Sequence, residues 1–257
     1  MNILVCVKRV PLTGGKITLT EDEQAIQTRH LGFTVSPHEE CAAEEAIRLI
    51  EQHGGESVVL TLGPAEAEEQ LRDMMAIGVD RAIHLVTDGS EWDPQATAAA
   101  IVEAIRADGA SFDLLLFGNE SADAGNYQVA VRVAAALGRP CVTGIKAITV
   151  KDGSPDAVRC EQEVPGGRDV YEVAMPAVVT VKEGINLPRY PSVPGRMRAK
   201  RKPLAASQPS RPGVGGVGLQ MRRLVLPEGS TKQAEVLGSG PEAAPRVVEI
   251  LQEIGVV

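Results

Sequence analysis

Hydrophobic and polar positions alternate in blocks along the first 140 residues, and the blocks predict strands and helices in turn. Short, mostly apolar runs, typical of strands buried on both faces of a parallel sheet, occupy residues 3–7, 58–62, 82–86 and 114–117, and the last of these is unbroken. Helix-length segments with apolar residues three and four positions apart lie between them. This order predicts an α/β fold with a doubly wound, mostly parallel, Rossmann-like sheet of the nucleotide-binding type.

The first helix should begin at Ser36, with Pro37, His38 and Glu39 in its first turn. Ser at the N-cap and Glu three residues later form a capping-box pattern, and removing Ser36 is expected to cost about 1 kcal/mol. A lone histidine such as His38 is more often structural than a ligand. The helix runs to about residue 53 and buries an alanine-rich stripe, so its charged residues are expected to face solvent. They are Glu40, Glu44, Glu45, Arg48 and Glu51.

A polar loop of residues 118–128, here called the central loop, follows the buried strand at 114–117 and leads into a helix that Gly138 ends. Its position at the carboxyl end of a parallel strand would present backbone N–H groups and a positive helix end to a phosphate. The alternative is a plain strand-to-helix connection, because every doubly wound fold contains several such loops.

After residue 141 the pattern changes to strands separated by hairpin signals, Asp152-Gly153 and Pro165-Gly166-Gly167. This predicts a β-hairpin excursion, after which residues 176–181 return to the main sheet. Residues 14–26 predict a second, smaller excursion. Residues 204–240 are rich in Pro, Gly and Ser and predict an extended arm, which ends in an amphipathic helix at 241–254 that should dock elsewhere. The predicted divisions are 1–185, 186–203 and 204–257.

Composition narrows the possible classes of protein. The net charge of −8 opposes nucleic-acid binding, and no apolar stretch approaches the roughly 20 residues that would insert into a membrane. No signal peptide precedes the first strand, which favours a cytoplasmic location. The cysteines are scattered singly, which predicts reduced thiols and neither a metal site nor a redox dithiol. They are Cys6, Cys41, Cys141 and Cys160.

Several motifs together resemble the beta subunit of electron transfer flavoprotein over nearly the full length. They are ILVCVKRV, SPHEECAAEEAIRL, LGPAEAEEQLRDMMAIGVDRAIHL, GNESADAGNYQ and PAVVTVKEGINLPRYPSVPGRMRAKRK. The resemblance implies an electron carrier without catalytic residues of its own, paired with an alpha subunit that holds most of an FAD site. It further implies acyl-CoA and related dehydrogenases as donors and a membrane quinone oxidoreductase as acceptor.

The resemblance also implies a nucleotide in the beta subunit, usually a structural AMP and, in electron-bifurcating relatives, a second FAD. Many relatives have three acids where this chain has Asp123, Ala124 and Gly125, and an Asn where it has Tyr127. The implied binding residues are Cys6, Ser36, Pro37, His38, Glu39, Leu62, Gly118, Asn119, Glu120, Ser121, Ala122, Asp123, Ala124, Gly125, Asn126, Tyr127, Gln128 and Val129.

The segment from Pro191 to Arg198 resembles the family's recognition loop, an exposed loop leading to a short basic helix. Val193 takes the position of the aliphatic side chain that enters a pocket on a dehydrogenase, and Pro191 and Pro194 stiffen the loop. Arg196 and Arg198 would steer an acidic partner. Local packing of Val193 is the alternative. The alternatives are a stand-alone ATP-binding protein and a nucleic-acid-binding module. The chain lacks the Walker lysine motif of the first, and its basic patch lacks the interleaved aromatics of the second.

Overall fold

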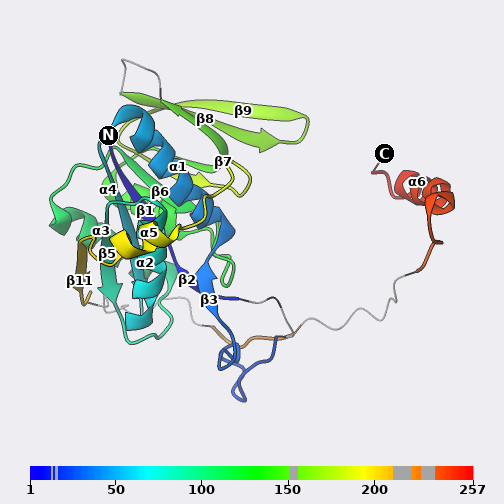
Figure 1. Ribbon diagram of the computed structural model, residues 1–257, viewed down its shortest axis with the longest axis horizontal. Helices are drawn as coiled ribbons and strands as arrows, with labels where there is room; N and C mark the ends of the chain where they lie inside the picture. Colours follow the sequence, from blue (N-terminus) through cyan, green and yellow to red (C-terminus); the bar gives the residue numbers. More distant parts are fainter. Residues whose placement is uncertain (13, 15–16, 151–155, 211–220, 227–234, 257) are drawn as a thin grey trace.

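The computed structural model describes residues 1–12, 14, 17–150, 156–210, 221–226 and 235–256 (Figure 1). Its main sheet is built from β1 Asn2–Cys6, β4 Glu56–Gly63, β5 Arg81–Val86, β6 Leu114–Gly118, β7 Cys141–Val150, β8 Ala157–Val164, β9 Gly167–Ala174, β10 Ala177–Val181 and β11 Leu204–Ser207. In this sheet the nine strands lie in the order β11-β5-β4-β1-β6-β10-β7-β8-β9. Neighbours run parallel from β11 to β7. The predicted α/β class is confirmed.

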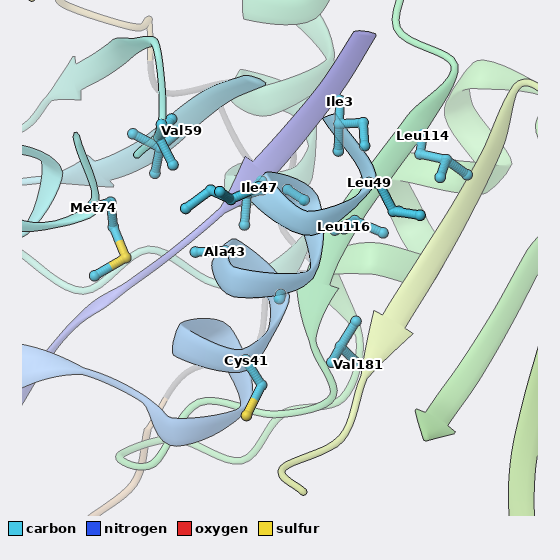
Figure 2. Close-up of a cluster of buried hydrophobic side chains, with 14 of the residues drawn as sticks. Ile3, Cys41, Ala43, Ile47, Leu49, Val59, Met74, Leu114, Leu116 and Val181 are labelled. Carbon is cyan, nitrogen blue, oxygen red and sulfur yellow. The ribbon is translucent and has the colours of Figure 1, made fainter. Parts of the chain in front are cut away.

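Helices cover both faces of this sheet, as a doubly wound fold requires. The helices α1 Pro37–His53 and α2 Glu68–Ile77, the latter entered through the 3₁₀ turn η1 Ala65–Ala67, pack on one face. The helices α3 Pro94–Asp108 and α4 Val129–Leu137 pack on the other. Figure 2 shows the first of the two cores, where Ala43 and Ile47 of α1 and Met74 of α2 meet strand side chains.

Alternation along the strands explains why two separate cores form. In β1, Ile3 and Val5 face the α1–α2 core, while Leu4 and Cys6 face the α3–α4 core, and each side chain is at most 6% exposed. Fully burying a side chain of this size stabilises the fold by about 1.5–3 kcal/mol. Continuous apolar runs are therefore needed in the central strands, which is the pattern that the sequence shows.

The second half of the chain extends the sheet at one edge. The strand β10 lies between β6 and β7, so the predicted return of residues 176–181 to the main sheet is confirmed. Strands β7, β8 and β9 are antiparallel neighbours, which confirms the hairpin excursion. Its turn at Pro165–Gly167 joins β8 to β9, with Gly166 at φ 85°. The predicted Asp152-Gly153 turn lies outside the described residues.

The small excursion near the N-terminus is also present in the described part. The strands β2 Arg9–Pro11 and β3 Phe33–Val35 pair antiparallel, and an isolated bridge joins Leu19 to Ile26. Arm residues lie against this excursion, since the Leu224 N–H donates to the Glu23 carbonyl at 2.8 Å. The excursion therefore holds part of the arm close to the body.

The C-terminal part contains α5 Val193–Ala199, η2 Pro241–Ala243 and α6 Ala244–Glu253. Because β11 pairs with β5, residues 204–207 belong to the sheet rather than to an extended arm. The helix α6 has no buried residue and stands apart from the sheet in Figure 1. The division of the chain into three parts stays a prediction, and residues 211–220 and 227–234 lie outside the described residues. No described helix is long and apolar enough to cross a membrane.

Candidate functional site

The first candidate region is the carboxyl edge of the parallel sheet, where β1, β6 and the first turn of α1 converge. Gly118 ends β6 directly against α1: a Cβ added there would lie 2.6 Å from Glu39 Cγ and 3.2 Å from His38 Cβ. Only glycine allows this close approach. The central loop therefore starts in contact with the helix turn that the sequence assigned to the same site.

Ser36 takes a different partner from the one predicted. Its buried hydroxyl does not cap α1; instead Ser36 Oγ accepts a hydrogen bond from the backbone N–H of Ala122 at 3.0 Å. The Ser36 half of the capping-box prediction is wrong, because the nearby central loop offers a backbone donor that needs an acceptor. The Ser36 backbone lies close enough to the Glu39 carboxylate to lower the pKa of Glu39, against the larger effect of burial. The Ser36 hydroxyl thus ties the central loop to α1.

Glu39 is a buried acid in the first turn of α1, and its side chain lies where the end of β1 and the end of β6 meet this helix. The backbone N–H of Lys8 donates to Glu39 Oε2 at 2.9 Å, and the residue is 7% exposed. Burial raises the pKa of Glu39 to about 8, and the neighbouring Asp123 charge adds to that effect, while the hydrogen bonds and Lys8 oppose it. Burial and Glu39 also raise the pKa of the Cys6 thiol at the end of β1.

Asp123 shows that the central loop can hold an oxyanion. Its carboxylate lies 2.7 Å from Lys8 Nζ and accepts a hydrogen bond from the Ala124 N–H at 2.7 Å. Burial would raise the pKa of Asp123, but Lys8 and the Ser121 hydroxyl hold it below the ordinary value. An ammonium group, a hydroxyl and a backbone N–H are also the donors that a phosphate group requires. The residues present therefore fit a nucleotide phosphate once the Asp123 carboxylate moves away from these donors.

The rest of the central loop is tied to neighbouring elements. His38 accepts a hydrogen bond at Nδ1 from the Glu183 N–H at 2.7 Å, and its Nε2 lies 3.5 Å from Glu120. Asn119 Oδ1 accepts from the Thr180 hydroxyl at 2.9 Å. The sequence did not indicate Thr180, Glu183 or Glu91, the last of which lies 3.3 Å from Lys8 Nζ. The position of residues 176–181 beside the strand at 114–117 was the signal that could have found Thr180 and Glu183.

The remaining predicted residues lie in β4, in the first turn of α1 and at the end of the central loop. Leu62 is in β4, two residues after Leu60, which pairs with Cys6 of β1. It packs against the α3–α4 core. Pro37 fills the first turn of α1. Gly125 and Tyr127 have positive φ angles of 54° and 55° and turn the loop toward α4. Asn126 lies between them, Gln128 is the N-cap of α4, and Val129 is the first residue of that helix. The assignment of these residues as nucleotide ligands stays a prediction.

The second candidate region is residues 186–199, here called the docking segment, which lies along α1 and α2. The expectation that Glu44 and Glu45 face solvent is wrong, since they are only 2% and 8% exposed. Arg189 covers Glu44 with two hydrogen bonds of 2.9 and 3.0 Å from its guanidinium. Asn186 Nδ2 donates to Glu45 Oε2 at 2.9 Å. The partner residues are distant in sequence, so helical periodicity alone could not reveal them.

The other end of the docking segment is the short helix α5. Ser192 caps it by accepting from the Gly195 N–H at 3.1 Å, and Val193 is its first residue rather than part of a preceding loop. A Cβ on Gly195 would lie 2.4 Å from the Ala76 carbonyl oxygen, so α5 rests directly on α2. Pro194 and Arg198 are exposed, and Pro191 is half-buried. A hollow of about 450 Å³ between α2 and α5 is lined by Glu68, Glu69, Arg72, Asp73, Arg196, Ala199 and Lys200.

Comparison with known proteins gives one consistent result. Residues 25–211 match the family model described as "Electron transfer flavoprotein domain". The "Electron transfer flavoprotein subunit beta" of Bacillus subtilis is 37% identical over 79% of this chain and 77% of its own length. The protein of the same name from Syntrophomonas wolfei is 38% identical over 80% and 79% of the two chains. The one from Mycobacterium leprae is 31% identical over 99% and 93%.

Proposed function

This chain belongs to the electron transfer flavoprotein family as a beta subunit, and from that premise we propose how it works. It pairs with an alpha subunit that holds most of an FAD site. The heterodimer accepts electrons from acyl-CoA and related dehydrogenases and passes them to a membrane quinone oxidoreductase. The beta chain contributes binding surfaces and carries out no bond-making chemistry itself.

The observation that carries the electron-transfer proposal is the exposure of Val193 on a segment held by the body of the protein. Val193 is 74% exposed and Tyr190 is 94% exposed, while their neighbours Arg189 and Gly195 are tied to α1 and α2. Exposed apolar side chains on an ordered segment suit a protein partner, because little conformational entropy is lost on binding. Arg196 and Arg198 add positive charge that attracts an acidic dehydrogenase surface.

A nucleotide at the carboxyl edge is the second part of the proposal. Its phosphate takes the place of the Asp123 carboxylate beside Lys8, Ser121 and the Ala124 N–H. AMP is the proposed ligand, with a structural role. The alternative is a second FAD in an electron-bifurcating flavoprotein, since this chain has Ala124 and Gly125 where many relatives carry acids.

The arm and α6 are proposed to dock on the alpha subunit. Val247, Val248 and Ile254 of the α6 region are 40%, 48% and 65% exposed, so their apolar stripe has room for a partner. Since residues 204–207 belong to the sheet, the informative truncation removes residues 208–257 and leaves β11 intact. A cytoplasmic location completes the proposal, supported by four free cysteines.

The docking proposal is tested by replacing Val193 with alanine in the heterodimer co-expressed with its alpha subunit. Loss of the methyl groups that the proposed partner would bury, worth roughly 1 kcal/mol, should slow reduction by an acyl-CoA dehydrogenase about fivefold. FAD content, heterodimer yield and reduction by dithionite should not change. Val170→Ala, in β9 with Val170 46% exposed, is the matched control. Equal rates for wild type and Val193→Ala would exclude the anchor role.

A further inference from the structure

We infer that Arg189 is a positioning residue for partner docking, which acts by fixing the docking segment to α1 so that Val193 is presented in one place. The inference rests on the proposed docking function and adds a residue that does not itself meet the partner. Arg189 stands four residues before Val193, and its side chain turns back toward α1 rather than toward a partner.

The contacts of Arg189 fix both its side chain and its backbone. The guanidinium bonds Glu44 at 2.9 and 3.0 Å and Glu51 at 2.7 and 3.1 Å, so both carboxylates are held in paired fashion. Its backbone N–H donates to Glu44 Oε2 at 3.1 Å. Planar, paired contacts of this kind set direction as well as distance. The chain at Arg189 therefore has little freedom to rotate or slide along α1.

Glu44 is suited to serve as a fixed attachment point. It is 2% exposed, and Arg48 bonds it from the same helix at 3.0 Å. Burial alone would raise the pKa of Glu44, but the hydrogen bonds from Arg189 and Arg48 keep the pKa below the ordinary value. The hydrogen bonds from the two arginines together keep this buried carboxylate ionised. Arg48 and Arg189 thus both donate hydrogen bonds to Glu44, and only Arg189 belongs to the docking segment.

The far end of the docking segment is fixed by α2. Arg196 lies 2.7 Å from Asp73, and Arg72 donates to the Ala199 carbonyl at 2.8 Å. Lys202 donates through Nζ to three carbonyls at the end of α2, those of Met75, Gly78 and Val79. The segment is therefore attached at two places, on α1 and on α2, and its apolar residues lie between or beside the attachments.

Exposure along the segment shows what this attachment achieves. Leu187, Tyr190, Val193 and Met197 are 85%, 94%, 74% and 65% exposed. Apolar side chains on an unattached loop would each sample many positions and lose that freedom on binding. Because the segment is attached to both α1 and α2, these side chains lose less conformational freedom on binding. Arg189 therefore increases partner affinity without contacting the partner, and its effect requires Val193.

The experiment is a double-mutant cycle in the heterodimer. The variants are Arg189→Met, Val193→Ala, the double variant, and Arg48→Met as a matched control that removes the other arginine on Glu44. The readouts are kcat and KM for the heterodimer as electron acceptor of a purified acyl-CoA dehydrogenase with its acyl-CoA substrate, together with FAD content and thermal midpoint.

Arg189→Met should raise KM about fivefold with kcat and FAD content unchanged, while Arg48→Met leaves KM unchanged. In the Val193→Ala background, Arg189→Met should add less than about twofold, because the two residues act through one anchor. Arg189→Lys should fall between wild type and Arg189→Met, since an ammonium group cannot bond both carboxylates in pairs. If Arg189→Met lowers the heterodimer yield, Glu51→Gln removes one carboxylate and should raise KM about twofold.

Each other outcome overturns the inference in a recognisable way. Equal KM shifts for Arg48→Met and Arg189→Met would assign the effect to the stability of Glu44. Fully multiplicative effects of Arg189→Met and Val193→Ala would separate Arg189 from the anchor. An unchanged KM for Arg189→Met, with Val193→Ala impaired, would refute the positioning role and leave the docking proposal intact. An unchanged KM for Val193→Ala would refute both the positioning role of Arg189 and the docking proposal.

Discussion

Glutamate side chains in two regions of α1 have pKa values shifted in opposite directions. In its first turn, burial raises the pKa of Glu39 to about 8. Further along, hydrogen bonds from Arg189 lower the pKa of Glu44 and of Glu51 below the ordinary value, although burial opposes this. The difference is the neighbouring cation, because Lys8 is engaged by Asp123 while the Arg189 guanidinium faces Glu44 and Glu51 directly.

The contrast assigns different roles to the two regions of the helix. At the carboxyl edge the charge of Glu39 is unfavourable, so that region is easily changed by protons or by a phosphate. Along the docking segment the charges of Glu44 and Glu51 are balanced, and that region is a fixed mount for exposed apolar residues. One helix therefore supports both the adaptable edge proposed to bind a nucleotide and the rigid segment proposed to dock a partner. Three changes test this difference, in descending order of expected effect.

The pH dependence of stability should come from Glu39. Between its ordinary value of 4.5 and about 8, the folded state binds more protons at Glu39 than the unfolded state does, so the free energy of unfolding should fall as the pH rises. The fall is on the order of 3 kcal/mol from pH 5 to 8. Chemical denaturation at each pH measures it.

Two variants distinguish the effect of Glu39 on the pH dependence of stability from that of Glu44. Glu39→Gln should flatten this slope, since glutamine does not titrate. Glu44→Gln should lower stability at neutral pH without changing the slope, because Glu44 has a lowered pKa and its contribution is lost only as the pH falls below about 4.5. A slope that survives Glu39→Gln would mean that another group titrates in this range.

Crowding the nucleotide edge should affect the nucleotide and not the docking segment. Gly118→Ala would place a Cβ 2.6 Å from Glu39 Cγ and push the first turn of α1 away from β6. Because this shift moves the helix turn that lines the proposed site, AMP should bind more weakly, by about 30-fold if roughly 2 kcal/mol of binding free energy is lost. The KM for an acyl-CoA dehydrogenase should stay at the wild-type value. Gly167→Ala, where an added Cβ meets open space, is the control, and equal AMP affinity in all three proteins would contradict the site.

Removing the charge of Asp123 should strengthen phosphate binding by a smaller factor. Asp123→Asn frees Lys8 from its 2.7 Å ion pair, so AMP should bind about fivefold more tightly to nucleotide-stripped heterodimer, while adenosine, which lacks phosphate, should bind as before. Calorimetric titration measures both. Asp22→Asn in the N-terminal excursion is the control. Weaker AMP binding by Asp123→Asn would make the carboxylate a ligand rather than a competitor.

The sequence predicted what depends on local pattern and missed what depends on distant partners. Continuous apolar runs such as Leu114 to Phe117 identified the parallel strands, because burial on both faces leaves no other pattern. Glu44 and Glu45 were assigned to solvent because helical spacing shows which face a residue occupies but not what later covers that face. Ser36 was assigned a local cap for the same reason, since Ala122 is far away in the chain.

The resemblance indicated both candidate regions as a prediction, yet it could not indicate how they are built. The pairing of Lys8 with Asp123 and the use of Arg189 to hold the docking segment follow from three-dimensional contacts between elements more than a hundred residues apart. Charge patterns along a single helix contain no information on such contacts. The identity of the proposed nucleotide depends on the same kind of contact.

The central claim is that the carboxyl edge of this beta subunit holds one AMP. Denaturing the purified heterodimer and identifying the released nucleotides by mass spectrometry tests it most directly. We expect one FAD and one AMP per heterodimer from wild type, and one FAD with little AMP from Gly118→Ala. Two FAD molecules and no AMP from wild type would contradict the claim and identify an electron-bifurcating flavoprotein instead.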